Sequence, residues 1–177
     1  LAANSPKAED FSNEALENEV LNTPAAELAK IAMERGNAER GRKLFYQSAA
    51  ACFACHDPPK GVARLGPDLA KLTTKLTAEE LVDSILRPSK LIDKEFAQVS
   101  VLDVDGNVRT GIRIAEDENA IILRNLAEPE PMTIDQEDVE EVLESKVSLM
   151  PENLARQLKS RKEFDDLMKY IIEIRQR

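Results

Sequence analysis

The sequence predicts an α+β fold in which helical segments at both ends of the chain bracket one small antiparallel β subdomain. Apolar residues recur with the period of a helix up to about residue 94 and again after about residue 147. Between these limits, over residues 95–146, they alternate with the period of a strand. The chain has 177 residues, of which 42% are hydrophobic, so its length suits one domain that carries an insertion.

Residues 1–36 are expected to form an N-terminal arm and one short helix. Residues 1–22 are polar and acidic with few apolar side chains to bury, which favours a mobile arm. Thr23 is placed to cap a helix whose first residue is Pro24, and Gly36 is placed to end that helix.

Three further helices are expected on the two sides of the insertion. Asn37 is placed to cap the first of them. The run Thr77–Glu80 reads as a capping box that opens the second, and Pro88 stops it. A second capping box, Ser160–Glu163, opens the last helix of the chain.

The insertion, residues 95–146, is expected to be a small sheet. The pair Asp105–Gly106 marks a hairpin turn, and strict alternation from Val108 to Ile114 marks the strand after it. The other expected elements are strands at Ala120–Leu126, at Pro131–Ile134 and before Ser148, and a helical turn at Asp138–Val142. Four or five short strands of this kind suggest an SH3-like or Sm-like barrel, by analogy of fold alone. The expected core is Val99, Val101, Ile112, Ile114, Ile121 and Leu123.

Charge and hydropathy exclude two classes of partner. The formal charge of −9 and the pI near 4.8 argue against nucleic acid, because phosphate binding depends on clustered Lys and Arg. No apolar run approaches the roughly 18 residues of a membrane span, so no transmembrane segment is expected. Residues 1–10 do not resemble an export signal, which suggests that one has been cleaved.

One short motif carries the chemistry of the sequence. Cys52-Phe53-Ala54-Cys55-His56 is the C-x-x-C-H arrangement of covalent c-type haem attachment, in which both thiols bond the porphyrin and the imidazole ligates the iron. A disulfide, a redox-active dithiol or half of a zinc site would use the same cysteines. Zinc needs two more ligands, whereas the chain has two Cys and one His, and a thioredoxin-like dithiol expects a βαβ setting that is missing. The low aromatic content, 4%, is consistent with a buried porphyrin.

Around this motif the chain resembles class I cytochromes c, and within them the haem-binding domain family common in planctomycetes and verrucomicrobia. The segments that carry the resemblance are Gly41–Phe45, Cys52–His56, Gly66–Leu69, Ser84–Ser89, Asp105–Gly106 and Ser148–Pro151. The resemblance extends from Arg35 to Ile174. It implies a mainly α-helical cytochrome c haem domain, residues 37–94 and 147–177, interrupted by the β subdomain of residues 95–146.

Met150 is the expected second iron ligand. With no second histidine, the far side of the iron is left with a thioether, water, a lysine or no ligand. Met33 and Met168 are expected on helices and Met132 in a strand, where packing explains a methionine. Met150 follows the insertion, precedes Pro151 and matches the Met-Pro of the family. The expected metal ligands are therefore His56 and Met150.

The resemblance also implies supporting residues. The carbonyl of Pro67 would accept a hydrogen bond from the ring N–H of His56, and Leu69 would pack on the haem. Gly41 would let its helix cross the last helix closely, beside Tyr170.

Motif and resemblance together imply a monohaem c-type cytochrome with one haem c, an exported, periplasmic electron carrier and not an enzyme. Its expected partner is a redox protein, with a periplasmic dehydrogenase or oxidase as candidates, and the acidic charge favours a basic docking patch on that partner. A gas sensor or ligand-binding protein is the alternative from another class, with Met150 displaced and the β subdomain as output module. A peroxidase would need polar distal groups, which the single histidine disfavours.

Overall fold

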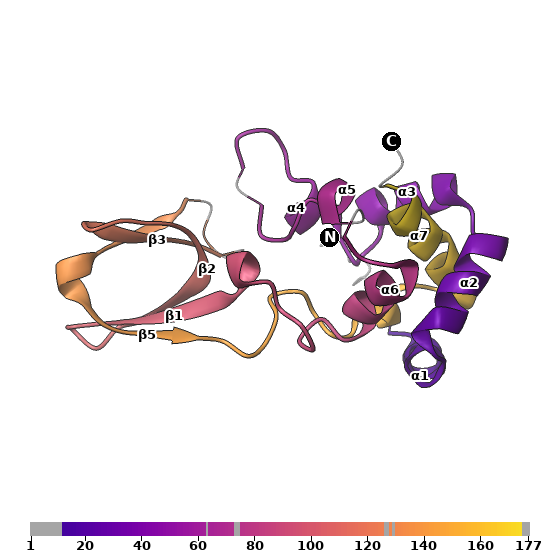
Figure 1. Ribbon diagram of the computed structural model, residues 1–177, viewed down its shortest axis with the longest axis horizontal. Helices are drawn as coiled ribbons and strands as arrows, with labels where there is room; N and C mark the ends of the chain where they lie inside the picture. Colours follow the sequence, from indigo (N-terminus) through magenta and orange to yellow (C-terminus); the bar gives the residue numbers. More distant parts are fainter. Residues whose placement is uncertain (1–11, 63, 73–74, 126–127, 129, 175–177) are drawn as a thin grey trace, which may run out of the picture.

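The computed structural model describes residues 12–62, 64–72, 75–125, 128 and 130–174. Within these residues the chain forms seven α-helices and one five-stranded antiparallel sheet, so the predicted α+β class is confirmed. Figure 1 shows the helices gathered at one end of an elongated molecule and the sheet at the other. No helix in the described part of the chain combines the length and the apolar character that a membrane span requires.

The helical part is built from both ends of the chain. Its α-helices are α1 Glu14–Asn22, α2 Ala25–Arg35, α3 Ala38–Gln47, α4 Phe53–His56, α5 Leu69–Leu72, α6 Ala78–Leu86 and α7 Arg161–Glu173. Short 3₁₀ turns occur at η1 Lys94–Phe96, η2 Gln136–Asp138 and η3 Leu154–Gln157.

The caps predicted for α3 and α6 are present, and the cap predicted for α7 is present in part. The side chain of Asn37 accepts a hydrogen bond from the N–H of Arg40 at 2.9 Å, and the run Thr77–Glu80 forms both bonds of a capping box. At α7 the hydroxyl of Ser160 accepts from the N–H of Glu163 at 3.3 Å. The carboxylate of Glu163 accepts instead from the N–H of Lys159, so the reciprocal half of that box is missing.

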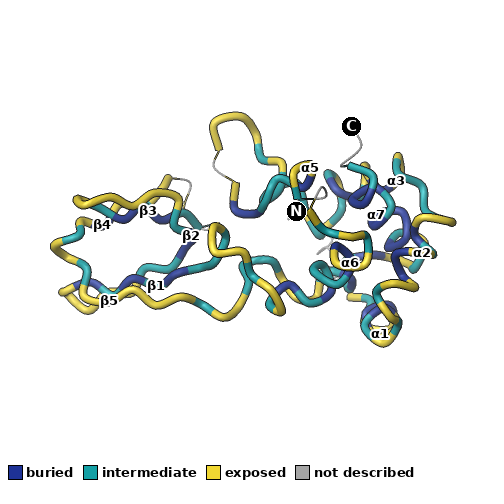
Figure 2. The backbone as a smooth tube through the Cα atoms, in the orientation of Figure 1, coloured by how far each residue is buried: buried dark blue, intermediate teal, exposed yellow. Residues whose placement is uncertain are grey.

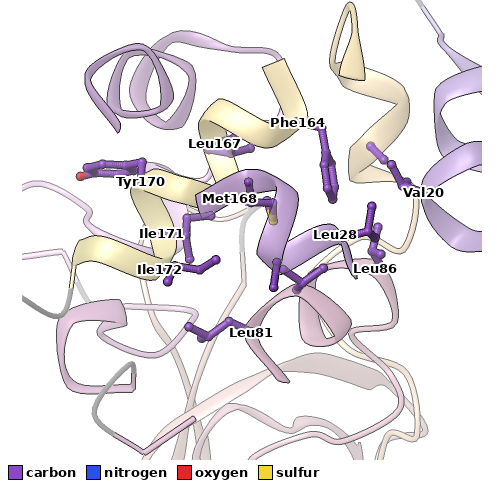
Figure 3. Close-up of a cluster of buried hydrophobic side chains, with 14 of the residues drawn as sticks. Val20, Leu28, Leu81, Leu86, Phe164, Leu167, Met168, Tyr170, Ile171 and Ile172 are labelled. Carbon is purple, nitrogen blue, oxygen red and sulfur yellow. The ribbon is translucent and has the colours of Figure 1, made fainter. Parts of the chain in front are cut away.

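α7 lies at the centre of the helical core (Figure 3), where it packs against α2 and α3. Phe164, Leu167, Met168 and Ile172 are all nearly fully buried on it. The crossing of α3 and α7 is as close as expected, because a Cβ built at Gly41 would lie only 2.7 Å from the Cβ of Tyr170.

The expectation of a mobile arm is wrong for residues 14–22, which form α1. Leu16 and Val20 of this helix are buried in the helical core. Glu17 is also buried, and its carboxylate accepts a hydrogen bond from the guanidinium of Arg156 in η3. The few apolar residues of this segment are enough to hold an ordered helix, because residues near the far end of the chain cover them. The rest of the expected arm, residues 1–11, lies outside the described residues.

The start of α2 also differs from expectation. Thr23 does not cap α2, because its hydroxyl donates to the carbonyl of Glu19 at 2.8 Å and so closes the end of α1. Pro24 is the residue before the helix. Gly36 follows the last helical residue, as predicted.

The sheet is a five-stranded antiparallel arrangement in the order β4-β3-β2-β1-β5. Its strands are β1 Gln98–Asp103, β2 Val108–Glu116, β3 Ala120–Arg124, β4 Met132–Asp135 and β5 Val139–Glu144. Gly106 turns the β1–β2 hairpin with a φ of +83°, a conformation that favours glycine. A separate hydrophobic cluster lies within the sheet and consists of Val99, Val101, Ile121, Leu123 and Ile134.

Two details of the sheet correct the sequence expectations. Ile114 is 38% exposed and does not belong to the core, because the β2–β3 register shifts between Arg113 and Ala115 and interrupts the alternation there. The helical turn before the last strand is η2, and β5 already begins at Val139, within the range expected to be helical. Leu126, at the end of the expected third strand, is outside the described residues.

Two chain segments connect the sheet with the helical part. The first leaves α6 and the second returns from β5 towards η3. They are joined where the N–H of Ser148 donates to the hydroxyl of Ser89 at 3.2 Å. Buried positions concentrate within the sheet and among the helices, whereas much of the second connection is exposed (Figure 2).

Candidate cofactor site

The cysteine motif forms a single helical turn, α4, five residues after the end of α3. Ala51 precedes it with a φ of +46°, so the chain reverses sharply before Cys52. The N–H of His56 donates to the carbonyl of Cys52 at 3.1 Å, which closes the turn. Cys52 and His56 therefore lie one helical turn apart, with Cys55 beside the histidine.

The ring of His56 is held in one orientation by the segment before α5. Its Nδ1 lies 2.9 Å from the carbonyl oxygen of Pro67. A carbonyl can only accept, so Nδ1 carries the proton and Nε2 keeps its lone pair. A Cβ built at Gly66 would lie 2.7 Å from Cε1 of the ring, so only glycine leaves room for this orientation.

Burial governs the protonation of His56. Desolvation lowers the pKa of the imidazole, and the positive charge of Arg64 lowers it further, while the bond to Pro67 acts in the opposite direction. The neutral ring, which is the form that ligates a metal, is therefore favoured.

Both cysteines are half-buried free thiols. Burial raises the pKa of Cys52 to about 11 and also raises the pKa of Cys55. A redox-active dithiol needs the opposite shift, because its attacking sulfur is a thiolate. The described residues also contain no group of three or more His, Cys, Asp or Glu side chains that could hold a metal ion, so a zinc site lacks ligands.

A small cavity of about 130 Å³ adjoins His56. It is lined by Phe45, His56, Asp57, Arg64, Asp68, Leu69, Ala70 and Ile174. Its volume is below the range of roughly 300–1,000 Å³ typical of ligand pockets. Most of the described residues of the loop between α4 and α5 are exposed, and the loop projects from the helical part (Figures 1 and 2).

The donor set fits a covalently attached porphyrin. Two thiols lie within one helical turn of an imidazole whose Nε2 has its lone pair available. Leu69 is buried and faces the same cavity as His56, which places an apolar side chain beside the ring. The two thiols and the ring would be the attachment points, with Leu69 as an apolar contact.

A contact that the sequence did not predict ties α3 to the end of the motif. The hydroxyl of Tyr46 donates to the Asp57 carboxylate at 2.5 Å, and this bond is the main reason that the pKa of Tyr46 is raised. The Tyr46 ring also lies 6.0 Å from the ring of Phe53. In the sequence, only the position of Asp57 directly after His56 could have drawn attention to it. Nothing in the sequence pointed to Tyr46, because it lies eleven residues from its partner.

The four methionines occupy different environments. Met168 is buried on α7 and Met132 packs against the sheet cluster, so both packing predictions are confirmed. Met33 is 37% exposed on α2, and the expectation that it packs in the core is wrong. Met33 falls on the outer side of α2 because Leu28, Ala29 and Ala32 form the buried side.

Met150 is half-buried in the connection after β5. Its N–H donates to the hydroxyl of Ser148 at 3.1 Å. The structure brings His56, Pro67 and Leu69 together, whereas within the described residues no hydrogen bond or shared cavity lining joins Met150 to His56. Its role as a ligand stays a prediction.

No family model matches the chain, and no match to it is found among curated proteins. The resemblance to class I cytochromes c therefore stays a prediction that depends on the residues quoted above.

Proposed function

We propose that the chain is a monohaem c-type cytochrome that carries single electrons in the periplasm. The observation that supports this most is the environment of His56. The ring directly follows Cys55 in the sequence and is fixed through Nδ1 by the Pro67 carbonyl at 2.9 Å, so Nε2 is left as a ligand.

Each residue of the site has a role in this proposal. The thiols of Cys52 and Cys55 hold the porphyrin covalently, and Nε2 of His56 binds the iron. The bond from His56 to Pro67 keeps the ring in place and increases its basicity as a ligand. When bound, the haem supplies a one-electron couple at the iron.

Met150 is the proposed second ligand. A His/Met pair raises the reduction potential relative to two nitrogen ligands, which suits an electron carrier. The segment of Met150 returns from the sheet beside Ser89, and Pro151 restricts Met150 to extended backbone. With His56, the thioether of Met150 would complete the protein groups that hold the iron.

The fold is proposed to be a cytochrome c domain with an SH3-like insertion. Close crossing of α3 and α7 at Gly41 and Tyr170 supports the first part. Five antiparallel strands with a 3₁₀ turn before the last strand support the second. The proposed boundaries are residues 37–94 and 147–177 for the haem domain and 95–146 for the insertion.

A second candidate function is supported by one observation. Among the described residues, the lining of the cavity beside His56 contains no methionine. An iron without a thioether ligand would bind a small gas, which is the property of a haem sensor. The β subdomain would then be the output module.

Carbon monoxide distinguishes the two functions. The wild-type holoprotein, reduced with dithionite, should keep its absorption spectrum when the gas is added, because a closed site offers no free position. Met150→Ala should bind carbon monoxide in the reduced state and lack the weak sulfur-to-iron band in the oxidised state, while Met132→Ala, the matched control in the sheet, should do neither. Stoichiometric binding by the wild type would favour the sensor, and binding by Met132→Ala alone would refute the ligand assignment.

Export is tested separately. Covalent attachment of haem c takes place outside the cytoplasm in bacteria, so attachment should require export and the maturation machinery. The same chain produced with and without an export signal should carry covalent haem only in the first case. Covalent holoprotein in the cytoplasm of cells without that machinery would contradict the periplasmic assignment.

A further inference from the structure

The negative charge of the protein is concentrated in the sheet region. Residues 95–146 contain fourteen Asp or Glu and four Lys or Arg, a formal charge of −10, whereas the whole chain carries −9. The remainder of the chain is therefore nearly neutral, at +1. A basic partner would be attracted to the sheet region and not to the helical part.

Within this region β5 is a free edge strand. It is the last strand in the order β4-β3-β2-β1-β5, and β1 is its only neighbour among the described strands. Five of its six residues are exposed (Figure 2). The opposite edge, β4, is shorter by two residues and follows Pro131. β5 is thus the longer of the two edges that could pair with another strand.

The side chains of β5 combine negative charge with exposed apolar surface on both faces. Glu141 lies opposite Leu102 of β1, and Glu144 lies opposite Val99, so the two carboxylates belong to opposite faces of the sheet. Among the described residues no ion pair involves the Glu140, Glu141 or Glu144 side chains. Between them, Val142 and Leu143 are 36% and 54% exposed.

We propose that the free edge of β5 binds an extended, basic segment of a partner protein by strand addition. Backbone hydrogen bonds along an edge supply affinity that does not depend on sequence, and side chains opposite each other supply the choice of partner. Lys or Arg opposite Glu140, Glu141 and Glu144, with aliphatic residues opposite Val142 and Leu143, would pair every exposed side chain of the strand. This interaction goes beyond electron transfer and does not need haem.

Charge on an edge strand has a competing explanation, because glutamates also prevent two edges from pairing with each other. That explanation predicts no affinity for a basic strand. The exposed Val142 and Leu143 favour binding, since an edge that only avoids contact gains nothing from exposed aliphatic side chains.

The test uses the full chain and a synthetic nine-residue peptide with Lys and Val placed opposite these side chains. A second peptide with the same side chains is N-methylated at alternate residues along one edge, which removes its backbone donors. Binding is followed by the amide NMR shifts of the protein at low and high salt. The first peptide should bind and shift the β5 amides, and the N-methylated peptide should lose most of the affinity.

Protein variants locate the contact. Glu141→Gln and Glu144→Gln should each weaken binding of the first peptide by up to about fivefold, the upper range for one cross-strand charge pair. Glu128→Gln removes the same charge from the same region between β3 and β4 and should leave binding unchanged. Absence of binding, equal binding of the N-methylated peptide, or equal weakening by Glu128→Gln would each overturn the proposal.

Discussion

The sheet and the helical part of this protein close their cores in different ways. The sheet cluster, from Val99 to Ile134, is formed by residues that are neighbours in the chain and contributes none of the candidate haem attachment residues. The helical core joins opposite ends of the chain, as where α3 crosses α7 or Glu17 meets Arg156. A core closed by local segments can fold without the rest of the molecule, whereas the helical core needs both of its halves.

This difference implies that the candidate site depends on the helical part and not on the sheet. Cys52, Cys55 and His56 lie on one short helical turn that follows α3 in the chain, and the Pro67 carbonyl that orients the histidine lies in a loop. A site of this kind depends on the helices that frame it. We therefore expect that changes in the sheet leave the site undisturbed, and the following variants test that independence.

The largest expected effect is that of Leu123→Ala in the sheet. Leu123 is fully buried in the sheet cluster, so its truncation should lower the free energy of unfolding of the sheet by about 2 to 5 kcal/mol. Hydrogen exchange measured separately for the two regions should show faster exchange in β1 to β5 only. Leu143→Ala, at an exposed position of β5, is the control and should change stability by less than about 0.5 kcal/mol. Equal loss of protection in the helices would show that the two regions are not independent.

Gly41→Val should destabilise the helical part and leave the sheet unchanged. The new side chain would begin 2.7 Å from the Cβ of Tyr170 and closer still to the carbonyl oxygen of Asp166, and backbone cannot move aside as a side chain can. Overpacking of this kind should lower the free energy of unfolding of the helical part by about 3 kcal/mol. Lys43→Val introduces the same side chain at an exposed position of α3 and is the control. If the sheet loses as much protection as α3 and α7, the two regions are not independent.

A smaller, pH-dependent effect is expected at Asp103 in the β1–β2 hairpin. Its carboxylate accepts a hydrogen bond from the N–H of Asn107 at 2.8 Å, which is the main cause of its lowered pKa, with the charge of Arg109 as a further cause. Because the pKa is lower in the folded state, this stabilisation is complete above the unfolded value of about 3.9 and is lost as pH falls through the folded value.

Asp103→Asn should therefore reduce the loss of the sheet's free energy of unfolding at acid pH. Urea unfolding at a series of pH values from neutral to below 4 checks this. Asp105→Asn, in the same turn but with an exposed side chain, should keep the wild-type profile. A wild-type profile without this acid loss, or one that is the same in Asp103→Asn, would contradict the role of Asp103.

Local signals in the sequence identified several caps and turns, although not the role of Thr23, which closes α1 instead of capping α2. Asn37 and Thr77 were identified as caps because their partners lie three residues away. Gly106 was identified as a turn residue because the conformation of a hairpin demands it. The fold class followed from the period of the apolar residues alone.

Contacts between distant segments were not predictable in this way. α1 is held by Arg156, which lies 139 residues beyond its partner Glu17, so no local pattern reveals that Leu16 would be covered. The shift at Ile114 depends on how β3 pairs with β2, which the alternation of β2 does not encode.

The candidate site was predicted from a motif and a resemblance, with unequal success. Its expected hydrogen bond between His56 and Pro67 is present, and Gly66 explains why the ring can approach. The partnership of Tyr46 with Asp57 was missed, because nothing in the spacing of the two residues links them.

Covalent attachment of haem is the central claim, and extraction with acid acetone tests it directly. The wild-type chain, exported to the periplasm of cells that have the maturation machinery, should retain its haem on the polypeptide. The pyridine haemochrome assay should give one haem per chain. Cys52→Ala and Cys55→Ala should lose this retention, while Ala54→Ser, which keeps both thiols and the spacing, should not. Complete extraction of haem from the wild type, or retention in a variant without either thiol, would contradict the account.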